Sequence, residues 1–274
     1  MELTADAIDR VVRTALAEDV GAGDRTTDGL VPPGARCRAS IHVEEDAVVC
    51  GLDVARAVFT ALDGGMGFEP VERDGATVSA GATVAALDGG ARAVLTGERT
   101  ALNLLGRLTG IATLTRRYVD AIAGTGVTIL DTRKTTPGLR ALEKYAVRCG
   151  GGTNHRAGLD DAILVKENHL RLAGGIGPAV AALRNGRPLE VEAETLAEVA
   201  EALDAGVERI LLDNMSPAEI SAAVDLVDGR AELEASGGIS LGNVHAYAAT
   251  GVDFISIGAL THGARSLHVS LDVL

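Results

Sequence analysis

Short apolar runs, each ending in a polar residue or a glycine, recur along the second half of the chain and constrain the fold more than any other feature. The intervals between the later run ends are 26, 21, 23 and 22 residues, and stretches of helical pattern such as "TLAEVAEALDAG" lie between them. Strands that alternate with helices at this period predict a parallel β-sheet. The six runs end at Asp131, Lys166, Glu192, Asp213, Ser236 and Gly258.

A parallel sheet of this kind can be an open, doubly wound sheet or a barrel. No GxGxxG motif follows an early strand, and nearly every strand ends in a residue with useful chemistry. Both observations favour the barrel, because the carboxyl ends of barrel strands converge at one mouth, where active sites form. About six units are visible, fewer than the eight of a complete barrel.

The residues before the barrel predict a separate α+β region that ends near residue 97. Thr4 can cap an amphipathic helix and "DVARAVFTALDG" predicts a second helix, whereas "EDVGAGDRTT" reads as a loop. "ARCRASIHVEEDAVVCG" and "GFEPVERDGATVSAGATVAALDG" predict short strands joined by turns. From Glu98 to about Gly124, leucines at helical spacing predict a long helix that connects the two parts.

The composition excludes several kinds of protein. Hydrophobic residues make up 47% of the 274 residues but aromatic residues only 2%, so a large core must consist of aliphatic side chains. The net charge of −13 argues against a general role on nucleic acids or membrane surfaces. Yet the segment 99–171 holds twelve Lys and Arg against six Asp and Glu, while the remainder holds thirteen against thirty-two. This basic middle suggests a site for an anionic small molecule; the alternative is a solvated basic helix face.

The three cysteines, Cys37, Cys50 and Cys149, are widely spaced and form no CxxC motif. We therefore expect reduced thiols and no zinc site. No apolar run approaches the length of a membrane span, and the N-terminal residues predict an amphipathic helix with acidic side chains rather than a signal peptide. These features predict a cytoplasmic protein.

Cations at the strand ends predict an anion-binding site. The chain has only three lysines, and two of them, Lys134 and Lys166, stand at the ends of predicted strands. Arginine offers a planar fork for a carboxylate and lysine a compact point charge, so a mixture fits a ligand with carboxylates and phosphates. For any single arginine a surface ion pair is the alternative, but the scarcity of lysine favours a function. The candidate cationic set is Arg99, Arg133, Lys134, His155, Arg156 and Lys166.

Acids and glycines end the later strands. Glu190 and Glu192 alternate with apolar residues, and Asp213 ends the next strand, so these carboxylates could hold a hydrated Mg²⁺ or the hydroxyls of a ribose. The alternative is that they only balance the lysine charges. The last two strands lead into glycine-containing loops, whose backbone amides could cradle a phosphate, although glycine also simply makes turns. The candidate phosphate-binding residues are Ser236, Gly237, Gly238 and Gly258.

Several segments together resemble the quinolinate phosphoribosyltransferase family. They are "ERTALNLLGRLTGIAT", "DTRKTTPGLRALEKYAVRCGGGTNHRAGLDDAILVKENH", "EVE", "ILLDNMSP" and "EASGGI", and "EDVGAGDRTT" is similar to the N-terminal signature of the family. The resemblance covers essentially the whole chain, and the block from "DTRKTTPGLR" to "GGGTNHR" is highly specific. Members are also called nicotinate-nucleotide pyrophosphorylases (carboxylating).

The resemblance implies a glycosyltransferase of de novo NAD biosynthesis that needs Mg²⁺. Quinolinate and phosphoribosyl pyrophosphate would give nicotinate mononucleotide, pyrophosphate and CO₂. The implied α/β fold has an N-terminal α+β sandwich domain at 1–110, with which 268–274 is expected to pair, and an incomplete, six- or seven-stranded α/β barrel at 111–267. The family forms homodimers in which one subunit caps the barrel mouth of its partner.

The same resemblance assigns roles by position. Lys134, Glu192 and Asp213 would be the catalytic residues that meet the ribose, the pyrophosphate and Mg²⁺, with the two acids as metal ligands either directly or through water. Arg99 would come across the dimer interface. The residues implied for the quinolinate carboxylates are Arg99, Arg133, His155, Arg156 and Lys166, and those implied for the phosphoribosyl group also include Ser236, Gly237, Gly238 and Gly258.

Three other functions remain as alternatives. A paralogous transferase of the molybdenum-transport type shares the fold and could act on another acid, although the presence of Arg99, His155 and Arg156 favours quinolinate. A phosphate-binding barrel isomerase or lyase would need a base rather than a carboxylate clamp. A non-catalytic ligand-binding protein could have kept the same fold.

Overall fold

A computed structural model of the chain describes residues 3–183 and 188–274. The chain divides into two compact units, each described here by itself. The first unit consists of residues 1–116, 135–151 and 260–274, and the second consists of residues 117–134 and 152–259. The first unit is therefore assembled from three separate stretches of chain.

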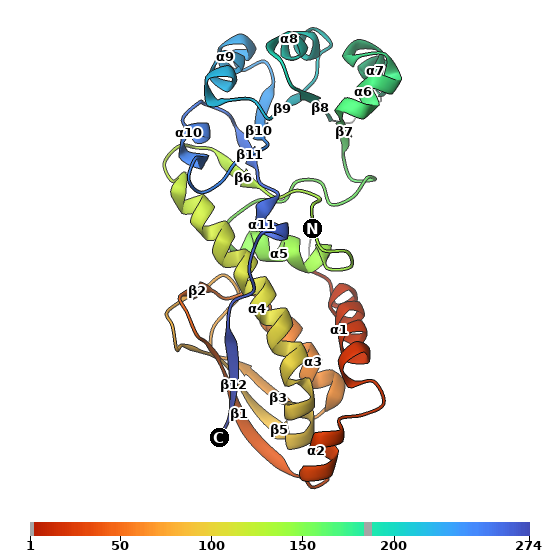
Figure 1. Cartoon of the computed structure of the whole chain (residues 1–274), viewed down its shortest axis with the longest axis vertical. Helices are drawn as coiled ribbons and strands as arrows, with labels where there is room; N and C mark the ends of the chain where they lie inside the picture. The colour runs from red at the N-terminus through yellow and green to blue at the C-terminus, as the bar shows by residue number, and fades with distance from the viewer. Residues whose placement is uncertain (1–2, 184–187) are drawn as a thin grey trace. The chain divides into compact units, whose positions relative to one another are not determined.

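The first unit is built on an antiparallel sheet whose strand order is β12-β1-β5-β3 (Figure 1). The last strand of the chain pairs with the first, so that Ile41 lies opposite Leu271. Ile41 and its neighbours Ala39 and Val43 are at most 1% exposed and belong to the core of this unit. The strands are β1 (Arg36–Val43), β3 (Gly67–Pro70), β5 (Thr83–Gly90) and β12 (Val269–Val273), and β2 (Ala47–Val48) pairs separately with β4 (Thr77–Val78).

Helices of the first unit begin at recognisable caps. The Thr4 side chain accepts from the backbone of Ala7, as the sequence predicts for the first helix. The prediction of a loop at "EDVGAGDRTT" is wrong in its last part, because Asp24 accepts from the backbone of Thr26 and Thr27 and starts a short helix. The helices are α1 (Ala5–Val20), α2 (Arg25–Leu30), α3 (Leu52–Leu62) and α5 (Arg140–Cys149).

The long helix α4 (Ala91–Ala121) starts seven residues before the predicted position at Glu98. Gly97 lies within it, although glycine is normally unfavourable inside a helix. A Cβ atom at Gly97 would lie 2.9 Å from Leu62 and 3.1 Å from Phe59 of α3. Position 97 thus needs glycine because α4 packs closely against α3 there. From the sequence alone, this glycine could equally have marked a position just before the start of a helix.

The second unit contains a six-stranded parallel sheet with strand order β6-β11-β10-β9-β8-β7. The first strand pairs with the last rather than with the second, which is the order of a barrel that lacks closure between β6 and β7. Thr153 forms a parallel bridge with Leu130 beside this gap. The incomplete α/β barrel that the sequence predicts is confirmed. The strands are β6 (Thr128–Leu130), β7 (Ile163–Val165), β8 (Leu189–Ala193), β9 (Arg209–Asp213), β10 (Glu232–Ser236) and β11 (Phe254–Ser256).

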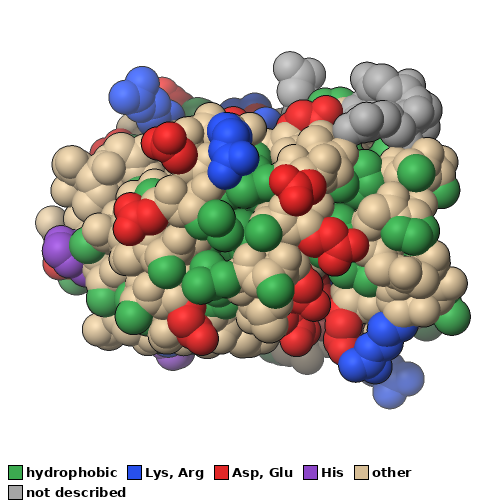
Figure 2. All heavy atoms as spheres, turned by 90° about the horizontal axis from the view of Figure 1, so that it is seen from above, with side chains coloured by type: hydrophobic (Ala, Val, Ile, Leu, Met, Phe, Trp, Pro, Cys, Tyr) green, Lys and Arg blue, Asp and Glu red, His purple; other side chains and the backbone are tan. Residues whose placement is uncertain are grey.

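Helices follow the barrel strands and cover their outer side (Figure 1). Thr195 with Glu198, and Ser216 with Glu219, form reciprocal capping boxes, and Pro217 occupies the first turn of α9 as its sequence predicts. Figure 2 looks onto α7, α8 and α9 and shows mainly apolar and acidic side chains there. The helices are α6 (Glu167–Ala173), α7 (Ile176–Leu183), α8 (Leu196–Asp204), α9 (Pro217–Val227) and α10 (Val244–Ala248). Helix α11 (Ala259–His262) begins at the last residue of this unit, and its other residues belong to the first unit.

None of the helices within residues 3–183 and 188–274 is both long and apolar enough to cross a membrane.

Candidate active site

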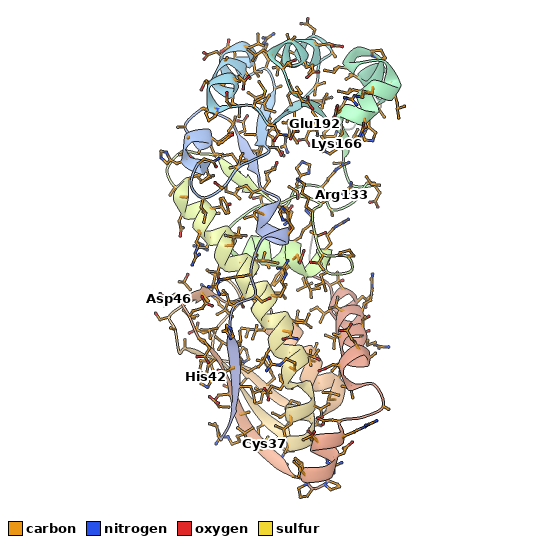
Figure 3. The ribbon with its side chains drawn as sticks, in the orientation of Figure 1. Cys37, His42, Asp46, Arg133, Lys166 and Glu192 are labelled. Atoms are coloured by element: carbon orange, nitrogen blue, oxygen red, sulfur yellow. The ribbon has the colours of Figure 1, made fainter. Side chains whose placement is uncertain are left out.

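The carboxyl ends of neighbouring barrel strands bring predicted site residues together. Lys166 follows the last residue of β7, Glu192 is the penultimate residue of β8, and Asp213 ends β9. Because β7, β8 and β9 are parallel neighbours, these side chains lie at the same edge of the sheet. Figure 3 labels Lys166 and Glu192 there, with Arg133 in the same unit.

Lys166 and Glu192 form a close ion pair. The Lys166 Nζ atom lies 2.5 Å from Glu192 Oε2. The lysine side chain is half exposed and the glutamate side chain is 9% exposed, so the pair stands at the boundary between barrel interior and solvent. A carboxylate in this position can exchange its lysine partner for a bound cation or a hydroxyl group.

Glu194 joins Glu192 and Asp213 in an acidic group whose oxygen atoms lie within 4.8 Å of one another. Burial raises the pKa of Asp213 and the charge of Glu192 raises it further, whereas Lys166 and Lys134 lower it. A divalent cation would relieve this repulsion, so the donor set fits Mg²⁺. Glu194 was not among the predicted site residues, although the alternation from Glu190 through Glu192 continues to it.

Two arginines approach each other in the same unit. Burial lowers the pKa of Arg156 and the positive charge of Arg133 lowers it further, whereas the negative charge of Glu190 raises it. The Arg156 Nη1 group donates to the carbonyl oxygen of Ala162 at 3.1 Å. Two guanidinium groups held near each other form a place where an anion would be bound strongly.

The loop "GGGTNHR" is fixed by an acid at the end of the first barrel strand. Asp131 is completely buried, and its two oxygens accept from the backbone of His155 at 2.9 Å and from the Asn154 amide at 2.7 Å. The sequence analysis noted Asp131 as a strand end but gave it no role. A buried acid directly after a strand was the available signal.

His155 lies inside the barrel, with its side chain 9% exposed. Its Nε2 atom is 3.1 Å from Glu190 Oε2 and 3.5 Å from Glu234 Oε2. Glu234, on β10, is a further residue that the sequence analysis missed. The predicted role of His155 in carboxylate binding stays a prediction.

The loop after β10 needs glycine for two reasons. Gly237 has a φ of 95°, and a Cβ atom there would lie 2.2 Å from the side-chain oxygen of Asn214. Gly238 has a φ of 63°. Glycines in these conformations carry no side chain of their own that would hinder a phosphate from reaching the backbone. The phosphate role of Ser236, Gly237, Gly238 and Gly258 stays a prediction.

Arg99 belongs to α4 in the first unit and is not among the strand-end residues of the barrel. Its side chain is 65% exposed, and its Nη2 atom lies 3.9 Å from Glu98 Oε1. The predicted contribution of Arg99 to the site of a partner subunit stays a prediction.

Comparison with family models agrees with this arrangement. The model described as quinolinate phosphoribosyl transferase, C-terminal domain, matches residues 111–272. The corresponding N-terminal domain model matches residues 24–109. The chain belongs to the quinolinate phosphoribosyltransferase family. Both parts of the family architecture are therefore present.

Similar proteins of the quinolinate phosphoribosyltransferase family span nearly the whole chain. The probable nicotinate-nucleotide pyrophosphorylase (carboxylating) of Synechocystis is 45% identical, in an alignment that covers 97% of this chain and 92% of the Synechocystis protein. The nicotinate-nucleotide pyrophosphorylase (carboxylating) of Mycobacterium leprae is 44% identical over 98% of both chains. The solved structure of the Francisella tularensis nicotinate-nucleotide pyrophosphorylase has a TM-score of 0.95 at 41% identity, covering 100% of this chain and 98% of that one.

Proposed function

We propose that the chain transfers the phosphoribosyl group of phosphoribosyl pyrophosphate to quinolinate with loss of CO₂, a step of NAD biosynthesis. The observation that carries this proposal is that Lys166, Glu192 and Asp213 meet at the carboxyl ends of neighbouring barrel strands, where Lys166 Nζ lies 2.5 Å from Glu192 Oε2. Cations and acids grouped in this way complement a dicarboxylate and a phosphorylated sugar with its metal ion. The family of the chain supports the same reaction.

The cationic residues hold the two carboxylates of quinolinate in this proposal. An arginine fork binds a carboxylate through two parallel hydrogen bonds, which fixes its orientation. Binding places the pyridine nitrogen next to the sugar, and this positioning of two anions that repel each other is the main catalytic task. The proposed quinolinate set is Arg133, His155, Arg156 and Lys166, with Arg99 from the partner subunit of a homodimer.

Glu192 and Asp213 are proposed to face the ribose and to hold Mg²⁺, directly or through water. When bound, Mg²⁺ would neutralise charge on the pyrophosphate leaving group. Lys134 adds a further positive charge for the pyrophosphate. The loops that contain Ser236, Gly237, Gly238 and Gly258 are proposed to bind the 5′-phosphate through backbone amides.

The chemistry needs no protein nucleophile. The pyridine nitrogen forms a bond to the anomeric carbon while the bond from that carbon to pyrophosphate breaks, and positive charge grows on the ribose ring. Glu192 and Asp213 stabilise this charge electrostatically. The C2 carboxylate then leaves as CO₂, its bonding electrons stay on C2 next to the cationic nitrogen, and C2 takes up a proton.

One assay tests the proposal. Purified protein is incubated with quinolinate, phosphoribosyl pyrophosphate and Mg²⁺, and released CO₂ and nicotinate mononucleotide are measured. We expect equal amounts of both products and none when either substrate is omitted. Absence of CO₂ with active, folded protein would refute the proposal, and turnover of another aromatic acid would favour the paralogous transferase. The homodimer and the cytoplasmic location are proposals that sedimentation and cell fractionation test separately.

A further inference from the structure

Two glutamates lie inside the barrel, where apolar side chains are usual. Glu190 on β8 and Glu234 on β10 are 7% and 0% exposed. They come from alternate strands, which is how side chains form one interior layer in such a barrel. Burying a carboxylate is costly unless it is paired, and apolar residues would pack here at lower cost. The presence of two acids therefore indicates a role beyond packing.

The His155 ring fills the space between these acids. Its Nε2 atom lies within 3.5 Å of a carboxylate oxygen of each. The loop that carries it reaches this depth because Thr153 pairs with β6 through backbone bonds to Ile129 and Asp131. The loop thus occupies the place of a further strand next to β6, and the imidazole acts as its interior side chain.

The surroundings of the ring determine which nitrogen carries the proton. The backbone N–H of Arg156 donates to Nδ1 of His155 at 2.7 Å, so Nδ1 must keep its lone pair. A neutral imidazole then carries its hydrogen on Nε2, facing the acids. The same hydrogen leaves Nε2 without a lone pair for a metal. The group His155, Glu190 and Glu234 is compact enough for a metal ion, but this tautomer argues against one.

The two acids need an N–H donor at this position. Both Glu234 oxygens and one Glu190 oxygen are buried, and they lie near the Nε2 atom of His155 but outside ideal hydrogen-bond geometry with it. The Ser256 hydroxyl is close enough to stabilise the Glu234 charge. Burial, and then repulsion from Glu190, raises the pKa of Glu234, while His155 lowers it. The ring is thus a group that lies within 3.5 Å of both acids and can present its Nε2 hydrogen to either.

The backbone next to His155 is held from a second direction. Asp131 accepts the backbone N–H of His155, and the ring of His155 accepts the backbone N–H of Arg156. A displaced ring would therefore release the Arg156 peptide. Holding the ring between β8 and β10 fixes the part of the loop that presents the Arg156 guanidinium.

We propose that Glu190 and Glu234 are positioning residues, which hold His155 as its Nε2–H tautomer and thereby orient Arg156 for the carboxylates of the substrate. The choice of substrate rests on the proposed function, whereas the tautomer does not. Neither glutamate needs to touch the substrate. Their removal should weaken binding of quinolinate more than binding of phosphoribosyl pyrophosphate.

Kinetics of four variants test the proposal. Glu190→Leu and Glu234→Leu remove the acceptors, whereas Glu190→Gln and Glu234→Gln keep an oxygen that can accept the Nε2 hydrogen. We expect each Leu variant to raise KM for quinolinate about tenfold and to change KM for phosphoribosyl pyrophosphate less than about twofold. The Gln variants should recover most of this loss. Glu232→Gln is the matched control, because Glu232 lies on β10, as Glu234 does, but has a 54% exposed side chain.

Nitrogen NMR provides a readout that does not depend on activity. In ¹⁵N-histidine-labelled wild-type protein without ligands, His155 should show a protonated Nε2 and an unprotonated Nδ1, assigned by comparison with His155→Gln. The Leu variants should lose this single tautomer, and the Gln variants should keep it. If a Leu variant does not fold, the wild-type spectrum still decides the tautomer.

Three results would overturn the proposal. They are an Nδ1–H tautomer in the wild-type protein, equal changes of both KM values in the Leu variants, and Leu variants with the KM values of the control. If wild-type protein has no activity with quinolinate, the proposed function fails, and the retention or loss of the Nε2–H tautomer in the variants still tests the positioning role.

Discussion

Arg133 and Arg156 repel each other in the barrel unit, whereas Lys166 is neutralised by Glu192 at 2.5 Å. A bound dicarboxylate would satisfy the arginines directly and would compete with Glu192 for the lysine. This difference between the cations means that the site is not simply a basic surface. It combines a lysine held by a carboxylate with two arginines whose positive charges act on each other.

We predict that Arg133→Gln and Lys166→Gln each lower kcat/KM for quinolinate about a hundredfold while the fold survives. Both substitutions remove a positive charge. At position 166, glutamine also keeps a hydrogen-bond donor near Glu192. The measurement is steady-state turnover together with a circular dichroism spectrum. Arg171→Gln is the control, because this arginine has a 72% exposed side chain and pairs with Glu167 four residues earlier. Wild-type activity in both site variants would contradict the assignment.

Glu234 predicts a pH dependence of stability. Burial and the charge of Glu190 raise its pKa from 4.5 to about 7, so the folded protein holds a proton that the unfolded chain releases. The resulting stabilisation is complete below pH 4.5 and is lost as the pH rises through about 7. Urea unfolding of wild type and Glu234→Gln across this range should show a smaller fall in unfolding free energy with pH in the variant. Parallel curves would contradict the raised pKa.

Helix α4 carries two glycines four residues apart, Gly106 and Gly110. Because they have no side chains, the backbone of residues 265–267 lies close to the helix. A Cβ atom at Gly110 would lie 2.0 Å from the carbonyl oxygen of Arg265, and one at Gly106 would lie 2.6 Å from that of Leu267. The backbone N–H of Leu267 donates to the carbonyl oxygen of Gly106. The two glycines thus form the surface on which this segment lies.

Gly110→Ala should therefore destabilise the protein by about 1–3 kcal/mol, since backbone atoms cannot move aside as a flexible side chain can. Gly29→Ala is the matched control, because Gly29 is also helical and a Cβ atom there meets nothing within 4 Å. Thermal unfolding measures both variants. We expect a lower Tm for Gly110→Ala and an equal or higher Tm for the control, and the opposite order would show that the close approach is not required.

The parts of the fold that the sequence predicted are those that depend on local patterns. The β/α rhythm located the barrel strands because periodicity depends on burial alone, and Ser216 predicted its cap through local chemistry. The start of α4 was misplaced because Gly97 serves packing against α3, which is a tertiary contact. The helix after Asp24 was missed because six residues are too few for a periodic pattern.

The candidate site was predictable to a similar extent. Strand-end cations and acids were found, since their positions follow from the strands. Glu194 and Glu234 were missed, and Asp131 was named as a strand end without a role, because the roles of these acids depend on which loop or strand faces them. Pairing of His155 with Glu190 and Glu234 joins positions up to 79 apart along the chain, and no local pattern encodes it.

For the molecule as a whole, the last strand completes the first sheet. β12 pairs with β1 over five residues, and the backbone of Leu274 also donates to Arg38. Without β12, one edge of β1 would be unpaired, which favours association between chains.

We predict that deleting residues 269–274 lowers Tm by about 5 °C or more and promotes aggregation. Differential scanning calorimetry and light scattering measure the two effects. Leu274→Ser is the control, because the side chain of Leu274 is exposed while its backbone bond is retained. A deletion variant that matches the control in both measurements would show that β12 adds no stability.

The position of β12 also has a consequence for synthesis on the ribosome. β12 leaves the exit tunnel after all the other strands described here. It is nevertheless an edge strand of a sheet whose remaining strands, β1, β3 and β5, are translated much earlier. During translation of the barrel, the backbone groups of β1 that later pair with β12 therefore have no strand beside them. During this interval a chaperone or a neighbouring nascent chain has its best opportunity to bind.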